Sequence, residues 1–148
     1  MMLIGINSIL SPDLLATLRA MGHGDEIAIV DGNYPALAHA RKLIRLDGLT
    51  LIPVIDAVLS VLPVDDFIDG ALFRSTVGDS ADVFDEIHHQ IVKICKRYVP
   101  KKSVVPLVGE AFYARVKNCH TLVSTSEPRL YGNLIIRKGV IYPTEDKL

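Results

Sequence analysis

The sequence predicts an α/β fold: a single layered domain over residues 1–148, with a mixed, largely parallel sheet flanked by helices. Two observations carry this prediction. Short apolar runs that suit buried strands alternate with longer amphipathic segments that suit helices, and such alternation is typical of α/β layers. The chain is also 49% hydrophobic over 148 residues, which is enough apolar material for one well-formed core.

In the N-terminal half, the first helix is expected to begin at Ser11, because Ser11 suits the N-cap and Pro12 the first helical position. Gly22 is expected to end it. Residues 27–30 are apolar throughout, which is typical of a strand buried on both faces. A loop at 31–35 and a largely buried helix at 53–62 follow.

In the C-terminal half, the clearest helix covers residues 82–98, with acidic residues early and basic residues late, as the helix dipole favours. Strands are expected at 71–76, 104–108, 121–125 and 134–136, and a short helix at 110–117. Pro106 interrupts the strand at 104–108, so that strand is expected at an edge of the sheet.

Composition excludes several classes of function. The net charge is −1 and neither sign is clustered, which argues against a nucleic-acid partner. The longest apolar stretch contains Pro53, Asp56 and Pro63 and is too broken to span a membrane. Cys95 and Cys119 show no pairing pattern, which indicates a reducing, cytoplasmic setting. The mean hydropathy of +0.31 favours apolar contacts between subunits.

The segment Gly22-His23-Gly24 is the most informative in the chain. Glycine on both sides allows a positive φ and a close approach to a ligand, and histidine carries protons near neutral pH. His23 is therefore a candidate general acid and base. The alternative is an exposed histidine beside a helix end, which the spacing alone favours slightly.

Three polar residues are candidates for binding a small molecule. Asp31 ends a buried strand, where α/β sheets place ligand groups, although an Asx-turn before Gly32 explains it equally well. Tyr131 and Asn133 offer a hydroxyl and an amide suited to sugar hydroxyls. Turn chemistry alone would also select the Gly132-Asn133 pair.

No cofactor or metal site is expected. Gly22-His23-Gly24 follows a helix and lacks a third glycine, so it is not a dinucleotide fingerprint. His88 and His89 are adjacent in a helix, so their rings point in different directions and do not share a metal. Gly-x-Ser-x-Gly and Walker patterns are absent.

In order along the chain, these pieces resemble the fucose mutarotase and ribose pyranase family, over about residues 9–140, and the match is closer to the fucose branch. The residues that carry the resemblance are Ile9-Leu10-Ser11-Pro12, Met21-Gly22-His23-Gly24-Asp25-Glu26, Asp31, Ile44-Arg45-Leu46-Asp47-Gly48-Leu49, Gly78-Asp79, Phe112-Tyr113 and Leu130-Tyr131-Gly132-Asn133-Leu134-Ile135-Ile136-Arg137-Lys138-Gly139-Val140.

The resemblance implies a layered α/β fold, ring-shaped homo-oligomers that are commonly decamers, and sites near subunit boundaries. It also implies that His23 is the acid and base, and that Asp31, Tyr131 and Asn133 bind the sugar. The expected activity is that of a cofactor-free isomerase that interconverts the α and β anomers of fucose or a related monosaccharide. The alternatives are a non-catalytic monosaccharide-binding protein of sugar uptake and a structural ring protein.

The chain departs from the family pattern at two places. The fucose branch usually has an arginine before its Phe-x-Phe-Tyr, where this chain has Gly109-Glu110. The family's Thr-Gly-Glu is here Thr125-Ser126-Glu127. A site without the arginine's donors is expected to discriminate less between sugars, so the preferred sugar stays open.

Overall fold

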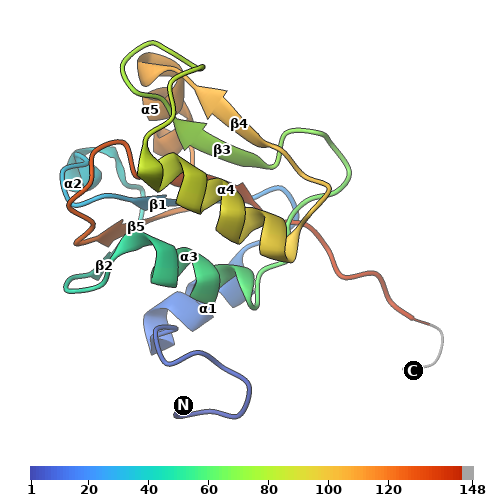
Figure 1. Cartoon of the computed structure of the whole chain (residues 1–148). Helices are drawn as coiled ribbons and strands as arrows, with labels where there is room; N and C mark the ends of the chain where they lie inside the picture. The colour runs from blue at the N-terminus through green and yellow to red at the C-terminus, as the bar shows by residue number, and fades with distance from the viewer. Residues whose placement is uncertain (145–148) are drawn as a thin grey trace.

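The computed structural model describes residues 1–144, in which helices cover both faces of one six-stranded sheet (Figure 1). The helices are α1 (Pro12–Ala20), α2 (Ala36–His39), α3 (Leu51–Leu59), α4 (Glu86–Tyr98) and α5 (Gly109–Lys117). The strands are β1 (Glu26–Val30), β2 (Leu43–Leu46), β3 (Leu72–Ser75), β4 (Val104–Leu107), β5 (Thr121–Thr125) and β6 (Leu134–Arg137).

The sheet has the strand order β2-β5-β1-β6-β3-β4. The pairs β2–β5, β5–β1 and β3–β4 are parallel, while β6 is antiparallel to both β1 and β3. The predicted mixed, largely parallel sheet is therefore confirmed. Because β6 alone runs the other way, its first residue lies at the end of the sheet where the other strands finish. We name this end the Asp31 end and the opposite one the His23 end.

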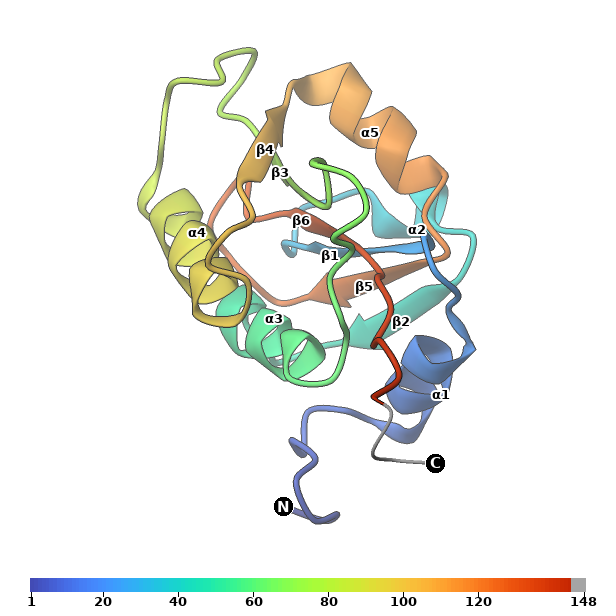
Figure 2. The same cartoon turned by 90° about the vertical axis from the view of Figure 1, so that its right-hand side faces the viewer.

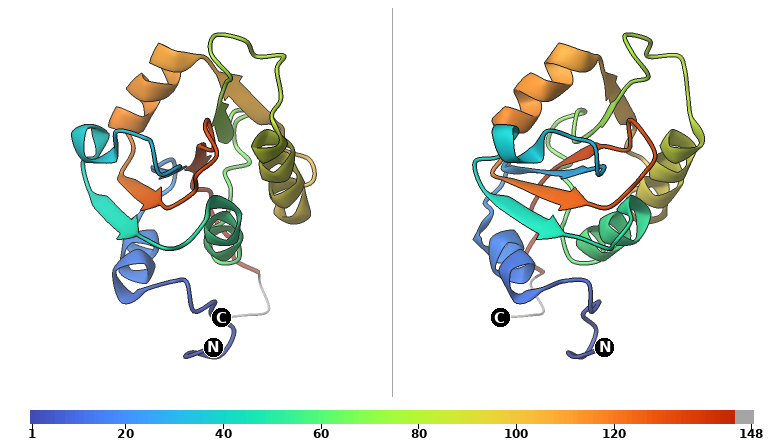
Figure 3. Two further views of the ribbon diagram at one scale, coloured as in Figure 1. Left: turned by 60° about the vertical axis from the view of Figure 1, so that its left-hand side comes forward. Right: turned by 90° about the vertical axis from the view of Figure 1, so that its left-hand side faces the viewer.

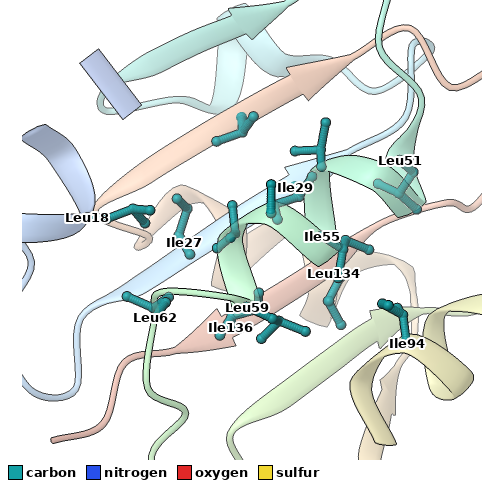
Figure 4. Packing of buried hydrophobic residues seen from close by; sticks show 14 of the residues in the cluster. Leu18, Ile27, Ile29, Leu51, Ile55, Leu59, Leu62, Ile94, Leu134 and Ile136 are labelled. Carbon is teal, nitrogen blue, oxygen red and sulfur yellow. The ribbon is translucent and has the colours of Figure 1, made fainter. Parts of the chain in front are cut away.

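Each face of the sheet buries its own apolar cluster. Ile27 and Ile29 of β1 face α1, α3 and α4, and Figure 4 shows them packed with Leu134 and Ile136 of β6 against α3. Ala28 and Val30 point the other way, toward α2 and α5. Figure 2 shows α3 and α4 on one side of the sheet and α5 on the other, and Figure 3 shows α2 beside α5. Both faces of β1 are thus buried, as its continuous apolar run predicted.

Several local predictions are confirmed. The Ser11 hydroxyl accepts a hydrogen bond from the Leu14 amide at 3.2 Å, so Ser11 is the N-cap of α1. Strand β4, which contains Pro106, lies at the edge of the sheet and pairs with β3. A proline is tolerated there because the outer side of an edge strand needs no amide donor.

Other boundaries differ from those expected. Helix α4 begins at Glu86 rather than 82, because Asp85 takes the N-cap position and forms a capping box with His88. Helix α3 begins two residues earlier than expected, at Leu51, and ends at Leu59. The short elements α2 and β2 were not predicted. Each has only four residues, which is too few to display a hydrophobic period.

Candidate functional site

The Asp31 end of the sheet holds a cavity of about 310 Å³. Asp31 follows β1, while Tyr131 and Asn133 precede β6, and the reversed direction of β6 is what brings them together. These three sequence-predicted residues line the cavity with Tyr34, Ser75 and Asp79. A carboxylate, an amide and several hydroxyls therefore meet in one hollow, which is the chemistry that a polyhydroxylated ligand requires.

The Asn133 side chain ties this site together. It is buried, its Oδ1 accepts a hydrogen bond from the Asp31 amide at 2.9 Å, and its Nδ2 donates to Ser75 Oγ at 3.0 Å. The amide thus links the ends of β1 and β3 across β6. Asn133 therefore has a structural role in the turn before β6, and it also lines the cavity.

Asp31 likewise has both predicted roles, because it forms an Asx-turn and also lines the cavity. Its Oδ1 accepts a hydrogen bond from the Asn33 amide at 2.9 Å, which is an Asx-turn, and its carboxyl group lines the cavity. Burial raises the pKa of Asp31, and hydrogen bonds from neighbouring amides oppose that shift. A carboxylate that is desolvated in this way is a strong acceptor for a ligand hydroxyl.

Tyr131 is held in an unusual conformation at the rim of the cavity. Its φ is 61°, which is the left-handed region and is uncommon for a tyrosine. Its carbonyl oxygen accepts hydrogen bonds from Ser75 Oγ at 2.9 Å and from His88 Nε2 at 3.0 Å. The imidazole donates through Nε2 because its Nδ1 accepts the Asp85 amide. The buried His88 therefore fixes the Tyr131 turn.

The charge of this cavity is negative. Asp31 and Asp79 line it, and among the described lining residues there is no lysine, arginine or histidine. A side chain at Gly109 would enter this space, since a Cβ there would lie 3.9 Å from Asp79 Oδ1. Gly109, where the chain departs from the family pattern, therefore lies next to Asp79.

A buried arginine supports the loop that carries Asp79. Arg74 of β3 is 1% exposed, and it donates hydrogen bonds to the carbonyl oxygens of Ser75 and Ala81. Its guanidinium carbon also lies 4.2 Å from the centre of the Phe84 ring. These contacts hold the loop between β3 and α4 in place.

His23 lies elsewhere, at the His23 end of the sheet. It precedes β1 whereas Asp31 follows that strand, and a strand of five residues is about 17 Å long. Gly24 has the expected positive φ of 85°, but the φ of Gly22 is not positive. The His23 side chain is 41% exposed and lines an apolar groove of about 480 Å³. One chain does not bring His23 to Asp31, Tyr131 and Asn133.

Ser75, His88 and Asp65 were missed as site residues. Ser75 and His88 carried a weak signal, since one ends an apolar strand and the other lies in an otherwise amphipathic helix. Asp65, which contacts His23 at 3.1 Å, gave no signal, because it lies 42 residues away in an irregular segment.

Within residues 1–144 no helix is long and apolar enough to cross a membrane. Over the same residues, no group of three or more histidine, cysteine or acidic side chains is placed to hold a metal ion. Cys95 and Cys119 are both free and buried.

Replacing Asn133 with alanine is expected to destabilise the fold by about 1–3 kcal/mol, because it leaves the buried Asp31 amide without an acceptor. Denaturant unfolding measures this loss. Asn118→Ala is the matched control, since Asn118 is exposed and is expected to cost less. Equal effects of the two variants would contradict the structural role of Asn133.

Residues 4–141 match the RbsD / FucU transport protein family. The chain is 35% identical to a fucose mutarotase of Danio rerio, over 95% of each chain, and 35% identical to an L-fucose mutarotase of Haemophilus influenzae, over 94% of this chain and 97% of that one. Among solved structures, the fucose mutarotase of Streptococcus pneumoniae in complex with L-fucose superposes with a TM-score of 0.87 at 36% identity, covering 95% of this chain and 100% of that chain.

Proposed function

Because the chain belongs to the RbsD / FucU transport protein family, we propose that it is a monosaccharide mutarotase that interconverts the α and β anomers of fucose or a related sugar. The observation that carries the proposal is the cavity at the Asp31 end, where the carboxylate of Asp31, the Asn133 amide and the Tyr131 turn converge. Relatives at about 35% identity over nearly the whole chain are fucose mutarotases, which supports the same reaction here.

The reaction needs only proton transfer. In ring opening, an acid protonates the ring oxygen as its bond to C1 breaks, and the anomeric hydroxyl gives up its proton to water as the aldehyde forms. Rotation about the C1–C2 bond and the reverse proton transfers close the ring on the other face. We assign the acid and base role to His23, since an imidazole can both donate and accept a proton. Asp31, Tyr131 and Asn133 hold the sugar.

The separation of His23 from the cavity supports a site shared by two copies of the chain. Exposed apolar side chains surround both halves of this site. Phe67, whose ring centroid lies 4.7 Å from that of His23, is 58% exposed, and Leu130 at the cavity rim is 57% exposed. Such patches mark contact surfaces. Two different patches that meet give a head-to-tail contact, which forms a ring when the rotation from one copy to the next closes on itself.

We therefore propose a ring-shaped homo-oligomer, a decamer as the family resemblance implies, in which His23 of one copy completes the cavity of the next. Light scattering at micromolar concentration gives the mass, and a monomer would contradict the proposal. The two buried free cysteines support a reducing compartment, so we propose the cytoplasm as the location.

The activity is tested by NMR saturation transfer between the anomers of L-fucose, D-galactose, D-ribose and L-rhamnose. We expect added protein to accelerate exchange for at least one of them. If a sugar binds without faster exchange, the chain is instead a non-catalytic sugar-binding protein. If none of the sugars binds, the chain is a structural ring protein.

Mixing two inactive variants tests the shared site. His23→Ala keeps the cavity, and Asn133→Ala keeps the histidine. When the two are unfolded and reassembled together, random mixing restores about a quarter of the sites if each site draws on two copies. Mixed rings that form but stay inactive would contradict the shared site.

The negative cavity predicts poor binding of sugar acids. D-galacturonate is expected to bind more weakly than D-galactose, because its carboxylate meets Asp31 and Asp79 without a facing cation. Gly109→Arg is expected to improve the binding of galacturonate, and Gly109→Ala serves as the control. NMR titration measures both. Equal affinity of the wild-type protein for the two sugars would contradict the assigned cavity charge.

A further inference from the structure

His23 has a buried carboxylate partner that comes from a distant segment of the chain. Its Nε2 lies 3.1 Å from Asp65 Oδ1, and the Asp65 side chain is fully buried. Asp65 lies in the segment between α3 and β3, where an isolated bridge pairs Val64 with Lys138 at the end of β6. The histidine ring is thus anchored on one nitrogen while the remainder stays partly open to solvent.

Donors contact both oxygens of the Asp65 carboxylate. Oδ1 also accepts a hydrogen bond from the Phe67 amide at 3.0 Å, and Oδ2 accepts one from Arg137 Nε at 2.7 Å. Burial raises the pKa of Asp65, but the hydrogen bonds from Phe67, Arg137 and His23 outweigh burial and hold the pKa at about 2. At neutral pH the group is therefore an anion that only accepts hydrogen bonds.

The backbone around Asp65 is also fixed. The Asp65 amide donates to the Arg137 carbonyl at 3.0 Å, and the Gly139 amide donates to the Pro63 carbonyl at 2.8 Å. A Cβ at Gly139 would lie 2.6 Å from the Val64 carbonyl oxygen, so only glycine permits this approach. On the histidine side, the Gly24 amide donates to the Lys138 carbonyl at 2.8 Å. Both partners are consequently tied to the end of β6.

This geometry determines which nitrogen of His23 is free. Because Asp65 can only accept, Nε2 carries a hydrogen, and Nδ1 has no hydrogen-bond partner among residues 1–144. We propose that Asp65 is a positioning residue that fixes the proton of His23 on Nε2, so that Nδ1 is the atom that exchanges a proton with the sugar. Arg137 holds Asp65 in its orientation. This inference rests on the proposed mutarotase function.

Each proton in the proposed reaction has a defined donor and acceptor. In ring opening, the imidazolium of His23 gives its Nδ1 proton to the ring oxygen as the bond from that oxygen to C1 breaks, and the anomeric hydroxyl releases its proton to water. The imidazole left behind keeps its Nε2 hydrogen toward Asp65. In closure, Nδ1 takes the proton back from the hydroxyl that attacks C1, and the aldehyde oxygen takes a proton from water to become the anomeric hydroxyl. The carboxylate stabilises the imidazolium and stays ionised throughout.

The test compares Asp65→Asn with Asp66→Asn in the full-length protein. Asp66 is exposed and adjacent, so its replacement is the matched control and is expected to leave exchange unchanged. For Asp65→Asn we expect kcat for L-fucose exchange to fall by about 10-fold or more, which is part of the roughly 10²–10⁴-fold that acid and base catalysis contributes as a whole. The KM is expected to change little, because Asp65 does not touch the sugar.

A pH profile separates positioning from mere stability. The charged groups near His23 are Asp65, Arg137 through Asp65, Asp25 two residues away, and Arg19 and Lys138 in the same groove. Removing the Asp65 charge is expected to move the midpoint of the kcat profile to lower pH, since a carboxylate stabilises the imidazolium. A folded Asp65→Asn protein with wild-type kcat and an unchanged profile would overturn the proposal.

A second pair of variants keeps the proposal testable if Asp65→Asn does not fold. Arg137→Lys preserves the positive charge beside Asp65 and is expected to retain most of kcat, whereas Arg137→Gln is expected to lose part of it. Wild-type kcat in both would overturn the proposal. Failure of the broader function is distinguishable, because then the wild-type protein itself would not accelerate exchange, or His23→Ala would keep the rate.

Discussion

Replacing His23 with alanine is expected to lower the catalysed rate of anomer exchange by about 10²–10⁴-fold, which is the usual contribution of a positioned acid and base. The side chain is 41% exposed and lies outside the main apolar clusters, so its removal leaves the core intact. Asp65 then stays paired with Arg137 and the Phe67 amide, and no buried charge is left alone. The loss is therefore expected in activity and not in folding.

The measurement is NMR saturation transfer on L-fucose, with circular dichroism and light scattering to show that the variant folds and assembles. His89→Ala is the matched control, since His89 is an exposed histidine on α4 that lines neither the cavity nor the groove of His23. We expect its exchange rate to equal that of the wild type. If a folded His23→Ala protein exchanged fucose at the wild-type rate, Tyr131 would become the leading candidate for the proton carrier.

Replacing Gly139 with alanine is expected to cost about 1–3 kcal/mol of stability, the usual penalty for overpacking. The new Cβ would lie 2.6 Å from the Val64 carbonyl oxygen and 2.8 Å from the Asp65 Cα. Both are backbone atoms, which do not move aside as a flexible side chain would. The segment that carries Asp65 must shift, so exchange activity is expected to fall together with stability.

Thermal unfolding at equal protomer concentration measures the effect, since the proposed assembly would make the midpoint depend on concentration. Gly109→Ala is the matched control. A Cβ there meets only Asp79 Oδ1 at 3.9 Å, an ordinary contact, and Gly109 is the first residue of α5. Its replacement is expected to change stability by less than about 1 kcal/mol. A Gly139→Ala midpoint equal to that of Gly109→Ala would contradict the close packing at the His23 end.

Elements with strong local signals could be predicted from the sequence. The Ser11 N-cap and the continuous apolar run of β1 are properties of neighbouring residues, so the pattern and the structure agree. The edge position of β4 followed from Pro106 for the same reason. The start of α4 could not be predicted, because Val83 and Phe84 fit a helical apolar face, yet both are exposed while Asp85 caps the helix. There a local cap outweighs the hydrophobic period.

The amino-acid sequence was sufficient to predict the fold class, the family resemblance and the four candidate residues, since local patterns and short motifs carry these. How those residues are grouped depends on long-range packing. Asp31, Tyr131 and Asn133 meet because β6 runs antiparallel to its neighbours, and strand direction is set by long-range pairing rather than by residues close in sequence. His23 and Asp31 fall at opposite ends of β1 for the simple reason that an extended strand holds its two ends apart. The partnership of His23 with Asp65, across 42 residues, exists only once the segment after α3 packs against the end of β6.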